Sequence, residues 1–145
     1  MRFVRENDGV AHSIDIRSGQ VDGSQTIATS PLRERYAMTT ISTAGPATYT
    51  AAQLATTIAR DPNGANRTDV MPAAADIIAG FGLAVGDTAV LTIVNTTDAG
   101  TPETLTISGG TGNVFLGPAT IATAGAARWL VSAASASIVS FTRMV

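Results

Sequence analysis

The sequence predicts a mainly β protein: an antiparallel, jelly-roll-like β-sandwich over about residues 45–145, with one or two short helices and an extended N-terminal arm. Three observations support this prediction. After residue 82, short apolar or alternating runs are separated by Gly-rich turns, as is typical of sandwiches and barrels. The chain shows no βαβ alternation and no internal repeat. Helix start and stop signals gather in residues 50–81, which are expected to form a helical corner at one end of the sandwich.

The first helix of this corner is predicted to begin at Thr50. Gln53 follows three residues later, and this pair is a capping-box pattern in which each side chain can bond a free amide at the helix start. Leu54 and Ile58, four residues apart, are expected to form the apolar side of the helix.

The second helix is predicted to begin near Pro72, because proline fits the first turn of a helix. Gly80 and Gly82 are its candidate stops. Its buried side is expected to comprise Ala73, Ile77, Ile78 and Phe81.

The loop between the two helices is predicted to be stiff. Residues 61–64, Asp-Pro-Asn-Gly, follow the residue order that a type I turn prefers. Two Arg and two Asp lie close together in a chain otherwise poor in charge, so we expect them to pair and staple the loop. Such pairs contribute about 1 kcal/mol each when exposed and more when buried. The residues expected to organise the loop, or to contact another subunit, are Arg60, Asp61, Asn63, Arg67 and Asp69.

The rest of the chain after the corner is predicted to consist of short strands. The nearly continuous apolar run 89–94 is suited to a buried strand, and residues 95–102 are expected to be a polar hairpin loop. Residues 103–108 alternate, with Leu105 and Ile107 facing inward. Further strands are expected at 114–116, 119–123, 127–132 and 137–144.

The N-terminal part, residues 1–48, is expected to be separate from the domain at 49–145. Residues 10–17 alternate partly, as in a half-buried strand, while 19–31 are expected to be loop. Residues 32–38 are expected to be extended, and 41–48 to link to the corner. Two interpretations stay open for this part: an ordinary β-subdomain, or an arm that crosses to a neighbouring molecule.

Composition excludes several classes of function. The 145 residues carry a formal charge of −2, which gives no electrostatic footprint for nucleic acid. All basic residues are Arg, which suits interfaces, and the absence of Cys excludes disulfides and thiolate metal sites. No run is apolar and long enough for a membrane span or signal peptide, so we expect a soluble protein made in the cytoplasm. Few charges follow residue 70, which favours a surface buried in a symmetric assembly over a hydroxyl-covered monomer surface.

Catalytic, metal and cofactor sites are not expected. The only histidine, His12, has Ser13 and Asp15 too near in sequence to converge as a triad on a strand. The Gly-rich residues 109–112 lack the lysine and helix of a phosphate loop and are interpreted as a turn. Asp98 beside Asn95 offers one carboxylate, which is a poor calcium site.

The aromatic residue of most interest is Trp129, which lies in an apolar strand. We expect it to be core. The alternatives are a sugar-stacking platform or a wedge at a subunit interface.

One ordered run carries a resemblance to a known group of proteins. A helix ending in Arg-Asp-Pro-Asn-Gly at 60–64 is followed by Arg-Thr-Asp at 67–69, a Pro-led Ala-rich helix and two Thr-rich strands. This order resembles a small domain in virion proteins of tailed phages and some large viruses, among them capsid decoration (cement) proteins and trimeric head fibres or knobs. The resemblance covers about residues 49–141.

The resemblance implies a viral structural protein that decorates the outer capsid surface, made in the host cytoplasm. Together with the low charge, it implies a homotrimer whose partner is the major capsid protein. The alternative is a trimeric fibre or knob that binds a carbohydrate receptor. Residues 49–145 are expected to trimerise, and residues 1–48 to dock on the capsid through forked Arg donors and apolar anchors. The docking residues are expected to include Arg2, Phe3, Arg5, Arg17, Arg33, Arg35 and Tyr36.

Overall fold

The chain divides into two compact units, Met1–Arg35 and Tyr36–Val145. The structure, a computed structural model, describes residues 2–7, 10–15, 20–22, 37–98 and 100–144. The boundary lies earlier than the expected 48/49, because the strand β4 (Met38–Ile41) pairs with β5 (Thr57–Arg60) and so belongs to the second unit.

The first unit contains a three-stranded antiparallel sheet. The strand expected at 10–17 is confirmed as β2 (Val10–Asp15), which pairs with β1 (Arg2–Asn7). The third strand, β3 (Gln20–Asp22), lies within the segment expected to be loop, where it pairs with the end of β2.

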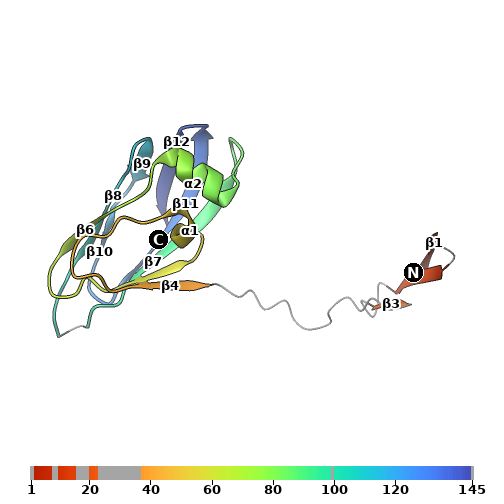
Figure 1. Cartoon of the computed structure of the whole chain (residues 1–145), viewed down its shortest axis with the longest axis horizontal. Coiled ribbons are helices and arrows are strands. Elements are labelled where there is room, and N and C mark those ends of the chain that lie inside the picture. Colours follow the sequence, from red (N-terminus) through yellow and green to blue (C-terminus); the bar gives the residue numbers. More distant parts are fainter. Residues whose placement is uncertain (1, 8–9, 16–19, 23–36, 99, 145) are drawn as a thin grey trace. The chain divides into compact units, whose positions relative to one another are not determined.

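The second unit is built from two sheets and two short helices (Figure 1). The larger sheet has six strands in the order β4-β5-β7-β11-β12-β9. Its members not yet given bounds are β7 (Thr88–Asn95), β9 (Asn113–Leu116), β11 (Ala126–Ser135) and β12 (Ile138–Met144).

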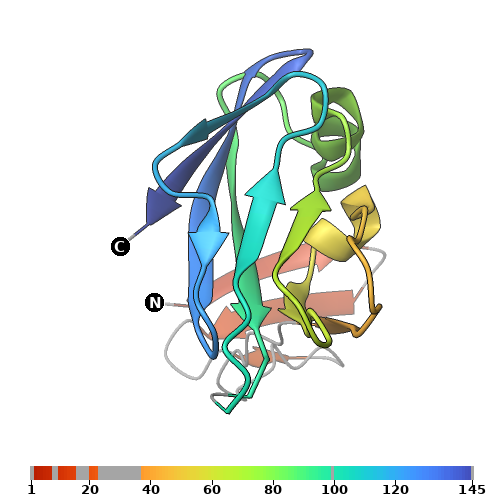
Figure 2. The same ribbon diagram turned by 90° about the vertical axis from the view of Figure 1, so that its left-hand side faces the viewer.

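The smaller sheet has three strands in the order β10-β8-β6, which lie in the foreground of Figure 2. They are β6 (Arg67–Val70), β8 (Leu105–Ser108) and β10 (Thr120–Ile121). The mainly β prediction is therefore confirmed, and the predicted strands in the C-terminal half are all present.

The expectation of antiparallel pairing throughout is wrong. β4 with β5, β5 with β7, β9 with β12, and β6 with β8 are parallel pairs. The jelly-roll topology is not confirmed. The segment 95–102 is not a hairpin loop either, because β7 and β8 belong to different sheets.

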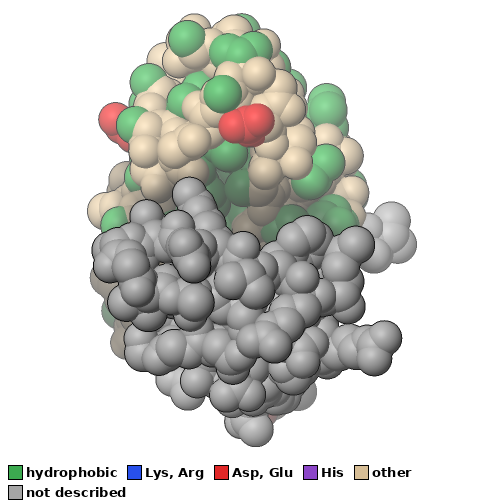
Figure 3. All heavy atoms as spheres, turned by 90° about the vertical axis from the view of Figure 1, so that its right-hand side faces the viewer, with side chains coloured by type: hydrophobic (Ala, Val, Ile, Leu, Met, Phe, Trp, Pro, Cys, Tyr) green, Lys and Arg blue, Asp and Glu red, His purple; other side chains and the backbone are tan. Residues whose placement is uncertain are grey.

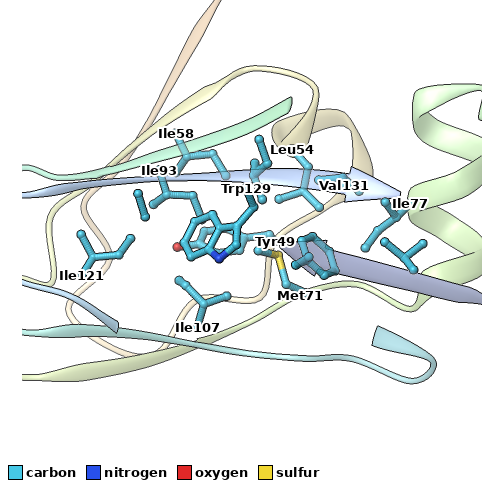
Figure 4. Close-up of a cluster of buried hydrophobic side chains, with 14 of the residues drawn as sticks. Tyr49, Leu54, Ile58, Met71, Ile77, Ile93, Ile107, Ile121, Trp129 and Val131 are labelled. Atoms are coloured by element: carbon cyan, nitrogen blue, oxygen red, sulfur yellow. The ribbon is translucent and has the colours of Figure 1, made fainter. Parts of the chain in front are cut away.

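The core fills the space between the two sheets (Figure 4). Strand alternation directs Leu91 and Ile93 of the larger sheet, and Leu105 and Ile107 of the smaller one, into it. The inward-facing prediction for β8 is thus confirmed. β7, expected to be buried on both sides, alternates instead.

Trp129 is 0% exposed and lies at the centre of this core, as expected. Phe115 meets its ring edge-on, with the centroids 6.2 Å apart, and stacks on Phe141. The side chain is therefore not available as a sugar platform or a wedge at a subunit interface.

The first helix, α1 (Ala51–Leu54), has the predicted capping box, with Thr50 and Gln53 bonding each other's backbone amides. The helix ends at Leu54, so the prediction that Ile58 continues its apolar side is wrong. Ile58 lies on β5, because the β-branched residues that follow the helix favour a strand that pairs on both sides.

The second helix, α2 (Ala74–Phe81), begins two residues after Pro72, with Ala73 as its N-cap. Ile77 is buried as expected, while Ile78 and Phe81 are half-buried. The stop predicted at Gly82 is confirmed: its φ is +64°, a left-handed conformation in which glycine is not strained.

Candidate functional site

The loops at one end of the sandwich are held by a buried ion pair. Arg60, at the end of β5, and Asp69, on β6, are both 0% exposed. Arg60 Nε donates to Asp69 Oδ2 over 2.7 Å, and Nη2 donates to Asp69 Oδ1 over 3.3 Å. This forked contact matches the planar guanidinium to the carboxylate, and it joins one strand of each sheet.

The Asp69 carboxylate receives two further hydrogen bonds. Tyr49 donates its hydroxyl to Oδ2 over 2.7 Å, and the backbone amide of Ala47 donates to Oδ1 over 2.7 Å. A buried carboxylate needs such a set of donors, because an uncompensated charge in the interior is strongly destabilising.

The remaining donors of Arg60 fix the loop that follows β4 and the start of the loop that follows β5. Nη1 donates to the carbonyls of Thr43, over 2.9 Å, and of Asp61. Nη2 also donates to the carbonyl of Gly45 over 2.6 Å. One guanidinium therefore satisfies the carboxylate and three loop carbonyls.

Exposed and half-exposed groups reinforce the same two loops. Arg67 donates to the carbonyls of Pro62, over 3.1 Å, and Ala44, over 2.8 Å. The Asp61 side chain accepts a bond from the Asn63 amide over 2.9 Å, the local contact typical of Asx turns. Asn63 has φ +53°, so the predicted type I turn, which requires a negative φ there, is wrong.

A second buried polar cluster lies around Glu103, which is 4% exposed. Its carboxylate accepts bonds from the Gly64 amide over 2.7 Å and from the Thr97 hydroxyl over 3.3 Å. Thr97 also lies 2.8 Å from Asn95 Oδ1, and the Asn95 amide donates to the Glu103 carbonyl over 2.8 Å. The cluster connects the loop before β8 to the loop before β6.

The Arg60–Asp69 pair and the cluster around Glu103 both hold loops of the second unit in place. Burial, followed by the hydrogen bond to Asp69, raises the pKa of Tyr49 well above its usual range, so the phenol stays neutral. Because Arg60 and Asp69 are fully buried, neither can itself contact a substrate or a second molecule. The prediction of a stapled loop is confirmed for this pair, whereas contact of these two with another subunit is excluded.

For the more accessible residues of the loop, contact with another subunit stays a prediction. Asp61 and Arg67 are half-buried and Asn63 is exposed, so each has atoms that a neighbouring subunit can reach. The docking residues Arg2, Phe3 and Arg5 lie on β1, while those at Arg17, Arg33, Arg35 and Tyr36 lie outside the described residues.

Sequence reasoning missed the partners of the ion pair and the cluster around Glu103. Tyr49 and Asp69 are 20 positions apart, and Gly64 and Glu103 are 39 apart. No local pattern contains such pairings. The one usable signal for Glu103 was its position two residues before the inward-facing Leu105, which continues the alternation of β8 into the loop before it.

Other kinds of site are not evident. Within the part of the chain that the structure describes, no three His, Cys, Asp or Glu residues come together as metal ligands. None of the described helices combines the length and apolarity that crossing a membrane requires. Comparisons with protein-family models, with curated proteins and with solved structures find no match.

Proposed function

We propose that the protein is a viral capsid decoration protein, which binds the outer capsid surface as a trimer and stabilises the head. The observation that carries this proposal is the ordered run at 60–72, whose Arg60 and Asp69 form the buried centre of a rigid loop cluster. A resemblance that rested on exposed charges alone would be weaker, because exposed charges are easily exchanged, while a buried pair constrains the surrounding fold.

The surface of the second unit also supports an assembly role. Figure 3 looks onto the side opposite to that of Figure 2, and the atoms of the second unit that are coloured in it are mainly apolar and uncharged groups with scattered carboxylates. Depletion of charge is the feature that distinguishes buried interface surface from solvated surface.

In this proposal the second unit is a jelly-roll-like sandwich modified by parallel strand pairs in both of its sheets. The unit before residue 36 is the docking arm. Three arms on one trimer would contact several capsid subunits, and each contact after the first would be effectively intramolecular. Cohesion of the shell would follow from this multivalent binding.

The experiment compares the full chain with a variant that begins at residue 36 and so keeps β4. Both are mixed with capsids lacking the decoration protein, and the bound fraction is measured by co-sedimentation. The full chain should bind saturably, in multiples of three copies, and the shortened chain should stay trimeric and lose binding. Failure of the full chain to bind would contradict the proposed function.

If the shortened chain binds with unchanged affinity, the docking polarity is wrong. In that case the helical corner would be the docking face. Substitution of the half-exposed Arg67 by Ala would then lower binding of the shortened chain.

A further inference from the structure

The outer face of the six-stranded sheet differs from every other surface of the described second unit. Of the seven exposed large apolar side chains, six lie on this sheet, and the other, Val85, lies in the loop before β7. The six are Met38, Val90, Val114, Leu116, Ile138 and Met144.

Strand register places all six on the same face. Val90 is paired with Leu130, which is paired with Thr142, which is paired with Leu116, so these four form one row across four strands. Their neighbours along each strand, such as Leu91 and Phe141, are buried in the core. The row therefore faces away from the core.

The same register makes the face almost free of charge. Arg128, paired with Thr92 and Met144, is the one charged side chain among the outward positions of the described strands of this sheet. The other outward positions are Thr, Ser, Ala or a larger apolar residue.

The smaller sheet provides an internal comparison. Its outward positions carry mainly hydroxyl groups, from Thr68, Thr106, Ser108 and Thr120, and none of the exposed large apolar side chains lies there. The two outer faces belong to the same unit and have the same kind of backbone, so the apolar character is specific to the larger sheet. Exposed apolar side chains gathered on one charge-poor face are typical of an interaction surface.

The size of the face fits a second copy of the chain. Adjacent strands lie about 4.8 Å apart and residues rise about 3.4 Å, so the six strands present roughly 600 Å² of flat surface. Side chains increase the accessible area beyond this value. Each partner in a stable interface buries about 800 Å². In a ring, each copy approaches this value only by burying the whole face, one half against each of its two neighbours.

We propose that this face is the surface through which copies of the chain meet, with the β9–β12 margin of one copy against the β4–β7 margin of the next. The apolar side chains divide between these margins: Met38 and Val90 on one, and Val114, Leu116, Ile138 and Met144 on the other. Arg128 lies on β11 between them. Two different patches in contact form a heterologous interface, which closes into a ring when the rotation between neighbouring copies permits it. The ring size of three rests on the proposed function.

The test places a charge on the face and measures molar mass by sedimentation velocity, without capsids. Val90→Glu and Leu116→Glu, one on each margin, should each raise the dissociation constant of the assembly at least tenfold. Val85→Glu is the matched control, since Val85 is 65% exposed and Val90 46%, and it should leave the assembly unchanged. Thr68→Glu, on the outer face of the smaller sheet, is the second control.

Folding of each variant is checked by far-UV circular dichroism. Val90→Thr, which keeps the side-chain shape, provides a milder version that should still weaken assembly. Unchanged assembly in folded Val90→Glu and Leu116→Glu, weakening by Val85→Glu or Thr68→Glu as strong as theirs, or a wild-type chain that is monomeric throughout, would each overturn the inference. Loss of capsid binding by a wild-type chain that still assembles would instead count against the proposed function alone.

Discussion

The guanidinium of Arg60 and the carboxylate of Asp69 form a fully buried ion pair that joins the two sheets of the second unit. Replacing Arg60 by Met should lower the free energy of unfolding by about 3–5 kcal/mol, because the carboxylate loses its charged partner. Three loop carbonyls also lose a donor. Urea denaturation followed by the fluorescence of Trp129, the only Trp, reports on this unit.

A double-mutant cycle measures the interaction energy between Arg60 and Asp69 apart from the other contacts of each residue. Asp69→Asn in the Arg60→Met background should cost much less than Asp69→Asn alone, because a neutral amide no longer leaves a buried charge unpaired. Arg67→Ala, which removes a half-exposed guanidinium, is the control and should cost about 1 kcal/mol. Additive effects of the two substitutions would show that the pair is not energetically coupled.

Alkaline pH should destabilise the second unit through Tyr49. Its pKa is raised in the folded state, so its contribution is complete below the unfolded pKa of 10.0 and is lost as pH rises above that value. One such group lowers the free energy of unfolding by about 1.4 kcal/mol per pH unit above 10. The chain has no Lys or Cys to obscure this range.

Tyr49→Phe is the matched variant for this measurement. It should be less stable at neutral pH by about 1 kcal/mol, because Asp69 loses a hydrogen bond, and the part of the alkaline slope due to Tyr49 should disappear. An equal slope in both proteins between pH 10 and 11 would mean that Tyr49 ionises in the folded state as it does in the unfolded chain.

Glu103→Ala should destabilise the protein by about 1–3 kcal/mol, because the buried carboxylate is the acceptor for the Gly64 amide. Glu103→Gln should cost less. Its amide oxygen can still accept from Gly64, and its nitrogen can donate to the Thr97 hydroxyl, whose own proton is directed to the nearer Asn95. Equal losses for the two substitutions, measured by urea denaturation, would rule out this account of the cluster.

Ala124, in the turn between β10 and β11, has φ +51° and offers a stabilising substitution. A left-handed conformation costs a non-glycine residue about 1–2 kcal/mol, and glycine loses about 0.5–1 kcal/mol through its greater freedom in the unfolded chain. Relief of the backbone strain outweighs this entropic cost, so Ala124→Gly should raise the free energy of unfolding by about 0.5–1 kcal/mol. A lower melting temperature for this variant would mean that Ala124 is not strained.

Much of the local structure could be predicted because its determinants are near in sequence. The capping box at Thr50 and the left-handed stop at Gly82 depend on residues within one turn of their helices. The inward direction of Leu105 and Ile107 follows from simple alternation along one strand.

The predictions that were wrong concern segments whose structure is decided by pairing with strands distant in the sequence. Ile58 fits a helical pattern by spacing, yet pairing with β4 and β7 makes it part of a strand. The parallel pairs that replace the expected antiparallel order join strands far apart in the chain, and no local residue pattern encodes such pairing. The low charge was predicted only as a feature of composition and was not assigned to one face of a sheet. Alternation along β7, β11 and β12 could have placed it on the outer face of the larger sheet.

The most direct measurement is the molar mass of the full chain in solution at micromolar concentration. We expect a trimer, at three times 14.7 kDa or about 44 kDa, whose mass falls to that of one chain when Val90→Glu is introduced into the outer face. A wild-type mass of 14.7 kDa at every concentration would contradict the claim that this charge-poor sandwich acts by assembling with copies of itself.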